Sequence, residues 1–133
     1  MLSGSCLCGG VKYQAAEPVT ALARCHCVQC RKASGSEFAS NGSVLAAHFE
    51  LLSGQELLRR YQSSPGEFRV FCGNCGSPLF KESAGRPDEV RLRLGCLDSE
   101  LTAGPAAHMF VSEKPAWSAI TDDLPQYQKL PGG

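Results

Sequence analysis

Apolar and polar residues alternate in two short stretches of the chain, which is the period expected of a strand with one buried face. The first stretch is VKYQA at residues 11–15, where Val11 and Tyr13 alternate with polar neighbours. The second is VRLRLG at residues 90–95, where three apolar side chains alternate with two arginines. The 14 glycines and 8 prolines interrupt the chain at short intervals, and no long helical stripe runs through it. The pattern predicts a mostly β fold with little helix.

The stretch from residue 53 to residue 76 fits two local structures. Ser53 and Glu56 have the spacing of a capping box, which would begin a helix. Alternatively, Ser-Pro-Gly at residues 64–66 turns the chain, and residues 68–72 form a strand that leads into a CxxC motif. We favour the hairpin, because a strand commonly enters a zinc knuckle. The main helical element is then expected to be a short helix after Cys30.

The length of 133 residues suits a single domain that covers residues 1–133. No repeat, low-complexity tract or linker divides the sequence. Pro125 and Pro131 interrupt its last stretch, so residues 125–133 are expected to form an irregular C-terminal tail.

The charge and the apolar runs of the chain narrow the choice of partners. Its 13 basic and 13 acidic residues balance to a net charge of zero, which disfavours binding to nucleic acids. The start, MLSGSCLCGG, lacks the pattern of a secretion signal, and no apolar run approaches the roughly 18 residues that span a bilayer. We therefore expect a cytoplasmic protein with small-molecule or protein partners and no membrane contact. Nothing in the sequence indicates an oligomeric state.

The cysteines of the chain have the spacing of metal ligands. Cytosolic thiols are kept reduced, so an even number of cysteines does not imply disulfides there. Seven of the 8 cysteines fall into CxC, CxCxxC and CxxC groups, formed by Cys6 and Cys8, by Cys25, Cys27 and Cys30, and by Cys72 and Cys75. Cys96 stands alone in an apolar setting and is interpreted as a packed thiol.

The two outer pairs predict a closed, structural zinc site. Zinc favours tetrahedral thiolate coordination, and its four ligands would be Cys6, Cys8, Cys72 and Cys75. Glycines beside both pairs permit the tight turns of such knuckles. The alternative is a set of small buried thiols, but core cysteines rarely fall into paired ligand spacing. Loss of this site should unfold the domain.

The central trio, Cys25, Cys27 and Cys30, predicts a second zinc site of a different kind. Structural sites are closed by four protein ligands, whereas catalytic sites keep three and leave one position for water or substrate. A fourth protein ligand would close the site, and the candidates for it are His26, His48, His108 and Cys96. An iron–sulfur cluster is a further alternative that ranks below zinc. A three-ligand site holds its metal less tightly, so the second zinc could be only partly occupied.

Polar residues near the trio are candidates for binding substrate and moving protons. Arg31 and Lys32 follow the last cysteine directly, where positive charge would lower the pKa of a thiol and attract a carboxylate. A solvated surface is the alternative interpretation of these two cations. His26 and Asp98 are candidates for handling protons.

The sequence contains, in this order, the blocks GSCLCGGVKY, CHCVQCRKASGS, RVFCGNCGSPLF, LGCLD and KPAWSAITDDLPQY. Their order and spacing resemble the glutathione-dependent formaldehyde-activating enzyme (GFA) family, which includes centromere protein V-like domains. The resemblance implies twisted antiparallel sheets in the arrangement called a β-tent. It also implies a structural zinc on the outer cysteine pairs and a catalytic zinc on the central trio, hence two zinc ions per chain.

The resemblance further implies carbon–sulfur lyase chemistry, in which glutathione and formaldehyde combine reversibly into S-hydroxymethylglutathione. The leading hypothesis is a zinc-dependent lyase that acts on an adduct of glutathione, or another thiol, with formaldehyde or a small aldehyde. The alternative is a zinc-stabilised protein-binding module without catalytic activity. The two hypotheses differ at the central trio, because only the enzyme needs an open metal position there.

Overall fold

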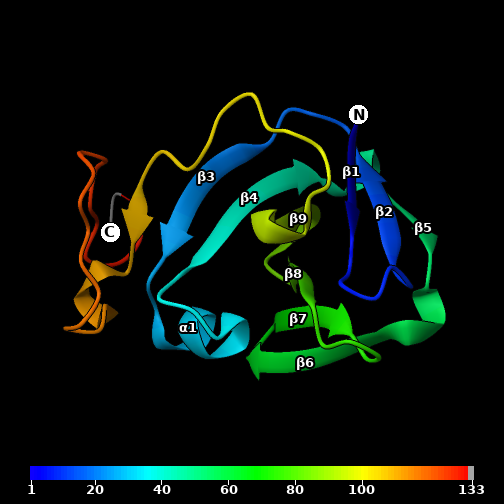
Figure 1. The fold of residues 1–133 in the computed structure, drawn as a ribbon, viewed down its shortest axis with the longest axis horizontal. Helices are drawn as coiled ribbons and strands as arrows, with labels where there is room; N and C mark the ends of the chain where they lie inside the picture. The colour runs from blue at the N-terminus through cyan, green and yellow to red at the C-terminus, as the bar shows by residue number, and fades with distance from the viewer. Residues whose placement is uncertain (132–133) are drawn as a thin grey trace.

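This computed structural model describes residues 1–131, which contain ten strands and one short α-helix (Figure 1). The strands are β1 (Leu2–Ser5), β2 (Lys12–Ala15), β3 (Thr20–Cys25), β4 (Ala39–Leu45), β5 (Phe49–Ser53), β6 (Leu58–Ser64), β7 (Glu67–Cys72), β8 (Pro78–Ser83), β9 (Arg86–Arg93) and β10 (His108–Met109). The helix is α1 (Val28–Ser34), and single 3-10 turns are η1 (Ala46–His48), η2 (Gln55–Leu57), η3 (Leu94–Cys96) and η4 (Val111–Glu113). Strands take up 44% of the chain and helices 15%, which confirms the mostly β fold with little helix.

The strands form two sheets. The smaller sheet has three strands in the order β1–β2–β5, and the larger has seven in the order β10–β3–β4–β9–β8–β7–β6. Neighbouring strands are antiparallel, except that β10 runs parallel to β3. The larger sheet twists strongly along its width, and the smaller sheet stands beside it at one end (Figure 1).

The main core contains residues of both sheets. Val11, just before β2, and Tyr13, within β2, are fully buried, as are Leu79 and Leu92 of the larger sheet. All four belong to one apolar cluster, so burial of apolar surface holds the two sheets together. The strand predicted at residues 11–15 is confirmed from Lys12 onward.

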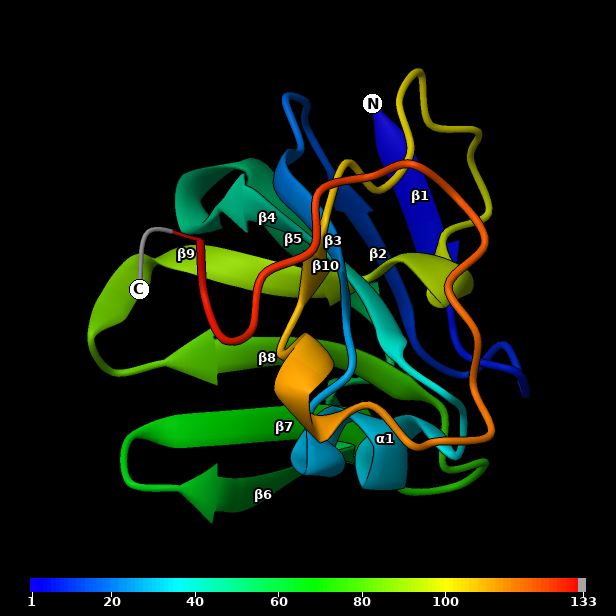
Figure 2. The same ribbon diagram turned by 90° about the vertical axis from the view of Figure 1, so that its left-hand side faces the viewer.

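Strand β9 confirms the predicted alternation but corrects the interpretation of its polar face. Val90 and Leu92 are buried in the main core, and Leu94 lies just beyond the strand in η3. Arg93, on the opposite face, is only 7% exposed, so this second face is not the solvated surface that a one-sided strand would have. The cause is the central position of β9 in the larger sheet, with α1 and the C-terminal segment nearby (Figure 2). This face of β9 borders a cavity that residues of α1 and residues 130–131 also line.

The hairpin predicted within residues 53–76 is confirmed, because β6 and β7 pair antiparallel around a turn at residues 65–66. The capping-box spacing at Ser53 corresponds only to the single 3-10 turn η2. The expected short helix after Cys30 begins earlier, at Val28, because the sulfur of Cys27 accepts a hydrogen bond from the Cys30 amide and caps the helix. No helix among residues 1–131 has the length and apolar character needed to cross a membrane.

The C-terminal segment, residues 114–131, returns to β10 and pairs with it in parallel around residues 125–127. The backbone amide of His108 donates to the carbonyl of Pro125 at 2.8 Å, and the amide of Tyr127 donates to the carbonyl of His108 at 2.9 Å. Its end, residues 130–131, borders the same cavity as β9. Positions 132–133 of the predicted tail at residues 125–133 lie outside the described residues. The assignment of the whole chain to one domain stays a prediction.

Gly54 offers a test of how closely the smaller sheet packs near the first cysteine pair. It has a φ of +87°, and an added Cβ would lie 2.2 Å from the carbonyl oxygen of Gly10. We expect Gly54→Ala to lower the free energy of unfolding by about 2–4 kcal/mol, through backbone strain and overpacking. Denaturant unfolding measures this change. The control is Gly85→Ala, where an added Cβ meets only the Ser83 hydroxyl at 4.0 Å; equal effects of both variants would contradict the explanation.

Candidate metal centres and cavity

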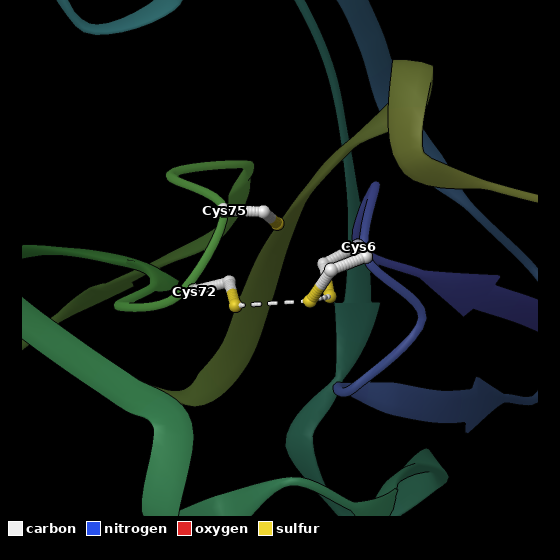
Figure 3. Close-up of side chains that lie close together, drawn as sticks. Cys6, Cys72 and Cys75 are labelled. Carbon is white, nitrogen blue, oxygen red and sulfur yellow. Dashed lines mark hydrogen bonds between the residues drawn. The ribbon is translucent and has the colours of Figure 1, made fainter.

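The four outer cysteines converge on one point between the two sheets. Cys6 and Cys8 lie in the loop between β1 and β2, whereas Cys72 ends β7 and Cys75 lies in the turn before β8. The sulfur of Cys8 lies 3.5 Å from that of Cys6 and 3.9 Å from that of Cys72, and all four sulfurs lie within 4.8 Å of one another. Figure 3 shows the sulfurs of Cys6, Cys72 and Cys75 turned toward one another.

Backbone turns aim these sulfurs at their common point. The amide of Val11 donates to the sulfur of Cys6 at 3.2 Å, which folds the first loop around that sulfur. In the second turn, the amide of Gly76 donates to the carbonyl of Cys72 at 2.8 Å, and Gly76 has a φ of +81° that favours glycine. The local sequences CLCGG and CGNCG therefore fold into two facing knuckles.

The four-thiol cluster fits a zinc ion. Tetrahedral zinc with Zn–S bonds of about 2.3 Å places its sulfurs about 3.8 Å apart, and the shorter distances in the cluster bracket this value. All eight cysteines are free of disulfides. A hydrogen bond from the Ser77 hydroxyl is the main cause that lowers the pKa of Cys75 to about 5, which favours the thiolate that metals bind.

The central trio forms the second cluster, at the junction of β3 and α1. Cys25 ends β3, Cys27 caps α1 and Cys30 lies in the first turn of that helix. Their three sulfurs also lie within 4.8 Å of one another, and the group includes no fourth histidine, cysteine, aspartate or glutamate from residues 1–131. The trio thus fits a metal ion held by three thiolates.

A cavity of about 700 Å³ opens beside the trio. All three cysteines line it, together with the cavity-facing side of the larger sheet and the apolar side chains of Met109, Phe110 and Leu130. Volumes of roughly 300–1,000 Å³ are typical of small-molecule sites. The trio therefore faces a space that is large enough for a substrate.

Arginines of the larger sheet surround Cys30. Both terminal nitrogens of Arg69 lie 3.9 Å from the sulfur of Cys30. Hydrogen bonds from Cys25 and Cys27 lower the pKa of the Cys30 thiol, and the positive charges of Arg93 and Arg69 lower it further. The cluster is therefore biased toward a thiolate before any metal binds.

The structure places the other candidate residues away from this cavity. Arg31 donates through its Nη2 to the carbonyl of Glu113 at 3.2 Å, and Lys32 is exposed to solvent. Asp98 accepts a hydrogen bond from the Ser5 hydroxyl at 2.7 Å, beside the loop of the four-thiol cluster. None of these three candidates lines the cavity.

The candidates for a fourth ligand also lie elsewhere. His48 is exposed in η1, and the sulfur of Cys96 donates to the carbonyl of Pro78 at 3.1 Å while packing against the main core. His26 is buried, and its Nε2 lies 2.8 Å from Nδ1 of His108. None of these residues joins the trio.

Sequence reasoning missed three of the arginines that line the cavity, Arg69, Arg91 and Arg93. A signal for them was present, because they occupy alternate positions opposite the apolar face of β7 and β9. The alternation predicts that these arginines lie on the face of the strand opposite the core. It could not show that other parts of the chain border this face.

Comparison with known proteins agrees with this arrangement. The model of the family described as glutathione-dependent formaldehyde-activating enzyme matches residues 1–113. The chain belongs to this family. Both cysteine clusters lie within the matched residues of this family member, whereas its C-terminal segment lies beyond them.

Individual relatives cover different shares of the chain. A protein of Halomonas elongata, described as a candidate glutathione-dependent formaldehyde-activating enzyme, is 32% identical over 133 residues, which cover 90% of this chain and 81% of that protein. An uncharacterized lyase of Schizosaccharomyces pombe is 32% identical over 77 residues, which cover 58% of this chain and 54% of the lyase. A crystal structure of a Rhodobacter sphaeroides protein has a TM-score of 0.64 at 22% identity, covering 77% of this chain and 97% of that one. The likeness to this structure shows the fold alone.

A chain of hydrogen bonds connects the trio's loop to the C-terminal segment of this GFA family member. Beyond its contact with His26, His108 approaches both carboxylate oxygens of Asp122 through Nε2, at 3.0 Å. Asp122 also pairs with Arg24 at 3.2 Å. The hydrogen bond from the Leu124 amide, followed by that from His108, lowers the pKa of the Asp122 carboxyl, so it is anionic at neutral pH.

We expect Asp122→Asn to loosen the C-terminal segment, because it removes the charge that holds His108 and Arg24. Amide hydrogen exchange at Tyr127 should become roughly two- to fivefold faster, as for loss of a partly exposed ion pair. Asp123→Asn, at the exposed neighbouring position, is the control and should leave the rate unchanged. Equal exchange in the native chain and in Asp122→Asn would contradict the role given to this contact.

The four-thiol cluster predicts a second measurable effect. Cys75→Ser should remove one zinc per chain and lower the unfolding temperature by roughly 10 °C or more, because it breaks the link between the sheets. Cys96→Ser should retain both metals, since Cys96 contacts the carbonyl of Pro78 and lies outside both clusters. Elemental analysis and thermal unfolding measure the two effects, and a full zinc content in Cys75→Ser would contradict the assignment.

Proposed function

We propose that this chain is a zinc-dependent carbon–sulfur lyase that forms and cleaves the adduct of formaldehyde and a thiol, with glutathione as the thiol and S-hydroxymethylglutathione as the adduct. The observation that carries the proposal is the convergence of three thiols, with no fourth ligand from residues 1–131, on the wall of a cavity of about 700 Å³. Membership in the GFA family supports it. We also propose a cytoplasmic location, where thiols are kept reduced.

The two clusters would hold two zinc ions with different roles. Cys6, Cys8, Cys72 and Cys75 would hold the structural ion, and Cys25, Cys27 and Cys30 the catalytic one. When bound at the trio, zinc would supply a Lewis acid that favours thiolate at neutral pH and polarises an aldehyde carbonyl. A binding module with two closed sites would need a fourth protein ligand at the trio, so the observed donor set favours the enzyme.

The reaction needs no oxidant or reductant. The sulfur of the thiol attacks the carbonyl carbon of formaldehyde, and a C–S bond forms while the C=O electron pair moves to oxygen. That oxygen takes up the proton that the thiol loses, and cleavage reverses each change. The chain must therefore hold a thiol and a small aldehyde side by side and permit one proton transfer.

The cavity supplies these conditions. Arg69, at 3.9 Å from Cys30, stabilises negative charge on the thiolates that face the substrate. The apolar side chains of Met109, Phe110 and Leu130 exclude water from part of the wall. The proposal does not use His26, Arg31, Lys32 or Asp98, because none of them lines the cavity.

Exchange spectroscopy by NMR tests the proposal. The rate at which formaldehyde and glutathione interconvert with their adduct should be higher with the zinc-loaded chain than in buffer. Cys27→Ser should return the rate to that of buffer, because it removes one of the three thiols that face the cavity. Cys96→Ser is the matched control and should retain the native rate. Equal rates in buffer, in the native chain and in Cys27→Ser would reject the assigned chemistry.

A further inference from the structure

Three cations stand side by side across the cavity face of the larger sheet. Arg69 on β7 is the register partner of Lys81 on β8, and Lys81 is the partner of Arg91 on β9. All three line the cavity, and Arg93 lines it from the same face of β9, two residues beyond Arg91. Like charges directly opposite each other destabilise a sheet unless something compensates them.

Within the described residues, only some of these positive charges lie beside a negative charge. Lys81 pairs with Glu67 at 3.6 Å, and Arg69 lies against the thiol of Cys30. Three thiolates with one zinc would carry a net charge of about minus one, which offsets the charge of only one of the arginines near it. Among residues 1–131, no ion pair is formed by Arg91 or Arg93.

The hydrogen-bond partners of Arg91 and Arg93 are all neutral. Nη1 of Arg91 donates to the carbonyl of Ala21 at 2.8 Å and to the hydroxyl of Ser43 at 2.9 Å. Nη1 of Arg93 donates to the side-chain oxygen of Asn41. These contacts fix the two guanidinium groups in place without neutralising their charge.

Arg93 also has an unused donor. The side chain of this residue is more than nine-tenths buried, and its Nη2 is buried without a hydrogen-bond partner. Burial lowers the pKa of both Arg91 and Arg93, yet a guanidinium remains charged in proteins. A buried cation with an unpartnered donor is costly unless an anion comes close to it.

We propose that Arg91 and Arg93 form a carboxylate-binding subsite that selects thiols carrying carboxylate groups, an inference that rests on the proposed function. Their positions two residues apart on one strand face place their Cα atoms about 7 Å apart, which suits one or two carboxylates of a small peptide. The subsite shares a cavity with the trio, so a thiol held there by its carboxylate can reach the cysteines. Arg91 and Arg93 are then the residues that determine specificity.

Arg86 provides a matched control on the same strand. It lines the same cavity, but its side chain is 73% exposed and pairs with Glu89 at 3.6 Å. Its charge is both solvated and compensated, so it should contribute little to carboxylate binding. Arg91→Gln and Arg86→Gln therefore remove the same charge from the same strand in two different environments.

Calorimetric titration of the zinc-loaded chain tests the subsite directly. The probes are S-methylglutathione, which has no free thiol, and its diester, which has no carboxylates. We expect the native chain to bind the acid roughly 10- to 100-fold more tightly than the diester, as for charge-assisted hydrogen bonds. Arg91→Gln and Arg93→Gln should each reduce this ratio at least about tenfold, whereas Arg86→Gln should leave it near the native value.

Thermal unfolding and zinc content of each variant establish that it is folded before titration. Because Arg93 is buried, its substitution can destabilise the fold, so Arg91→Lys serves as a second, milder variant. It should lose part of the preference for the acid, since lysine cannot form the bidentate hydrogen bond that a guanidinium makes with a carboxylate. Equal binding of acid and diester by the native chain, binding of neither, or full preference in Arg91→Gln would overturn the subsite.

Exchange measurements on the same samples separate the two proposals. Catalysed exchange of formaldehyde with glutathione and with its diester at equal rates would retain the lyase and overturn the subsite. A preference for the acid in the titration, without any catalysed exchange, would retain the carboxylate subsite and overturn the lyase.

Discussion

The convergence of four thiols between the two sheets is the constraint on which the rest of the structure depends. One pair follows β1, whereas Cys72 ends β7 and Cys75 lies in the turn before β8. The cluster therefore joins the smaller sheet to the larger one through two pairs that are more than 60 residues apart in sequence. The apolar core behind it reinforces the same junction. Because one face of the larger sheet packs against the smaller sheet at this junction, its other face is available to form the wall of a cavity.

The larger sheet consequently has two faces of opposite character. Its core face carries Val90 and Leu92, whereas its cavity face carries Arg91 and Arg93 from the same strand. The trio sits beside this cationic face at the start of a short helix. Positive charge on this face both stabilises thiolates and attracts anions. Both effects suit a site where a thiol reacts with an electrophile.

Part of this arrangement was predictable from the sequence, because some of its signals are local. The spacing of the cysteines predicted both clusters. The alternation of apolar and polar residues, together with the turn residues, predicted β2, β9 and the β6–β7 hairpin. The partners of His26 could not be predicted, since His108 lies far along the chain. Arg31 follows Cys30 directly, yet its side chain donates a hydrogen bond to the carbonyl of Glu113 and does not line the cavity. Whether the polar face of β9 was covered depended on how the end of the chain packs.

The most direct test of the account is zinc X-ray absorption of the purified chain at full metal loading. The account predicts two zinc ions per chain with an average of about 3.5 sulfur ligands each, since one ion is fully surrounded by thiolates and the other keeps a position for a lighter atom. Addition of glutathione should raise the average toward about four, as its sulfur occupies that position. Four sulfurs at both ions in the untreated protein, or no response to glutathione, would contradict the division into one closed and one open site.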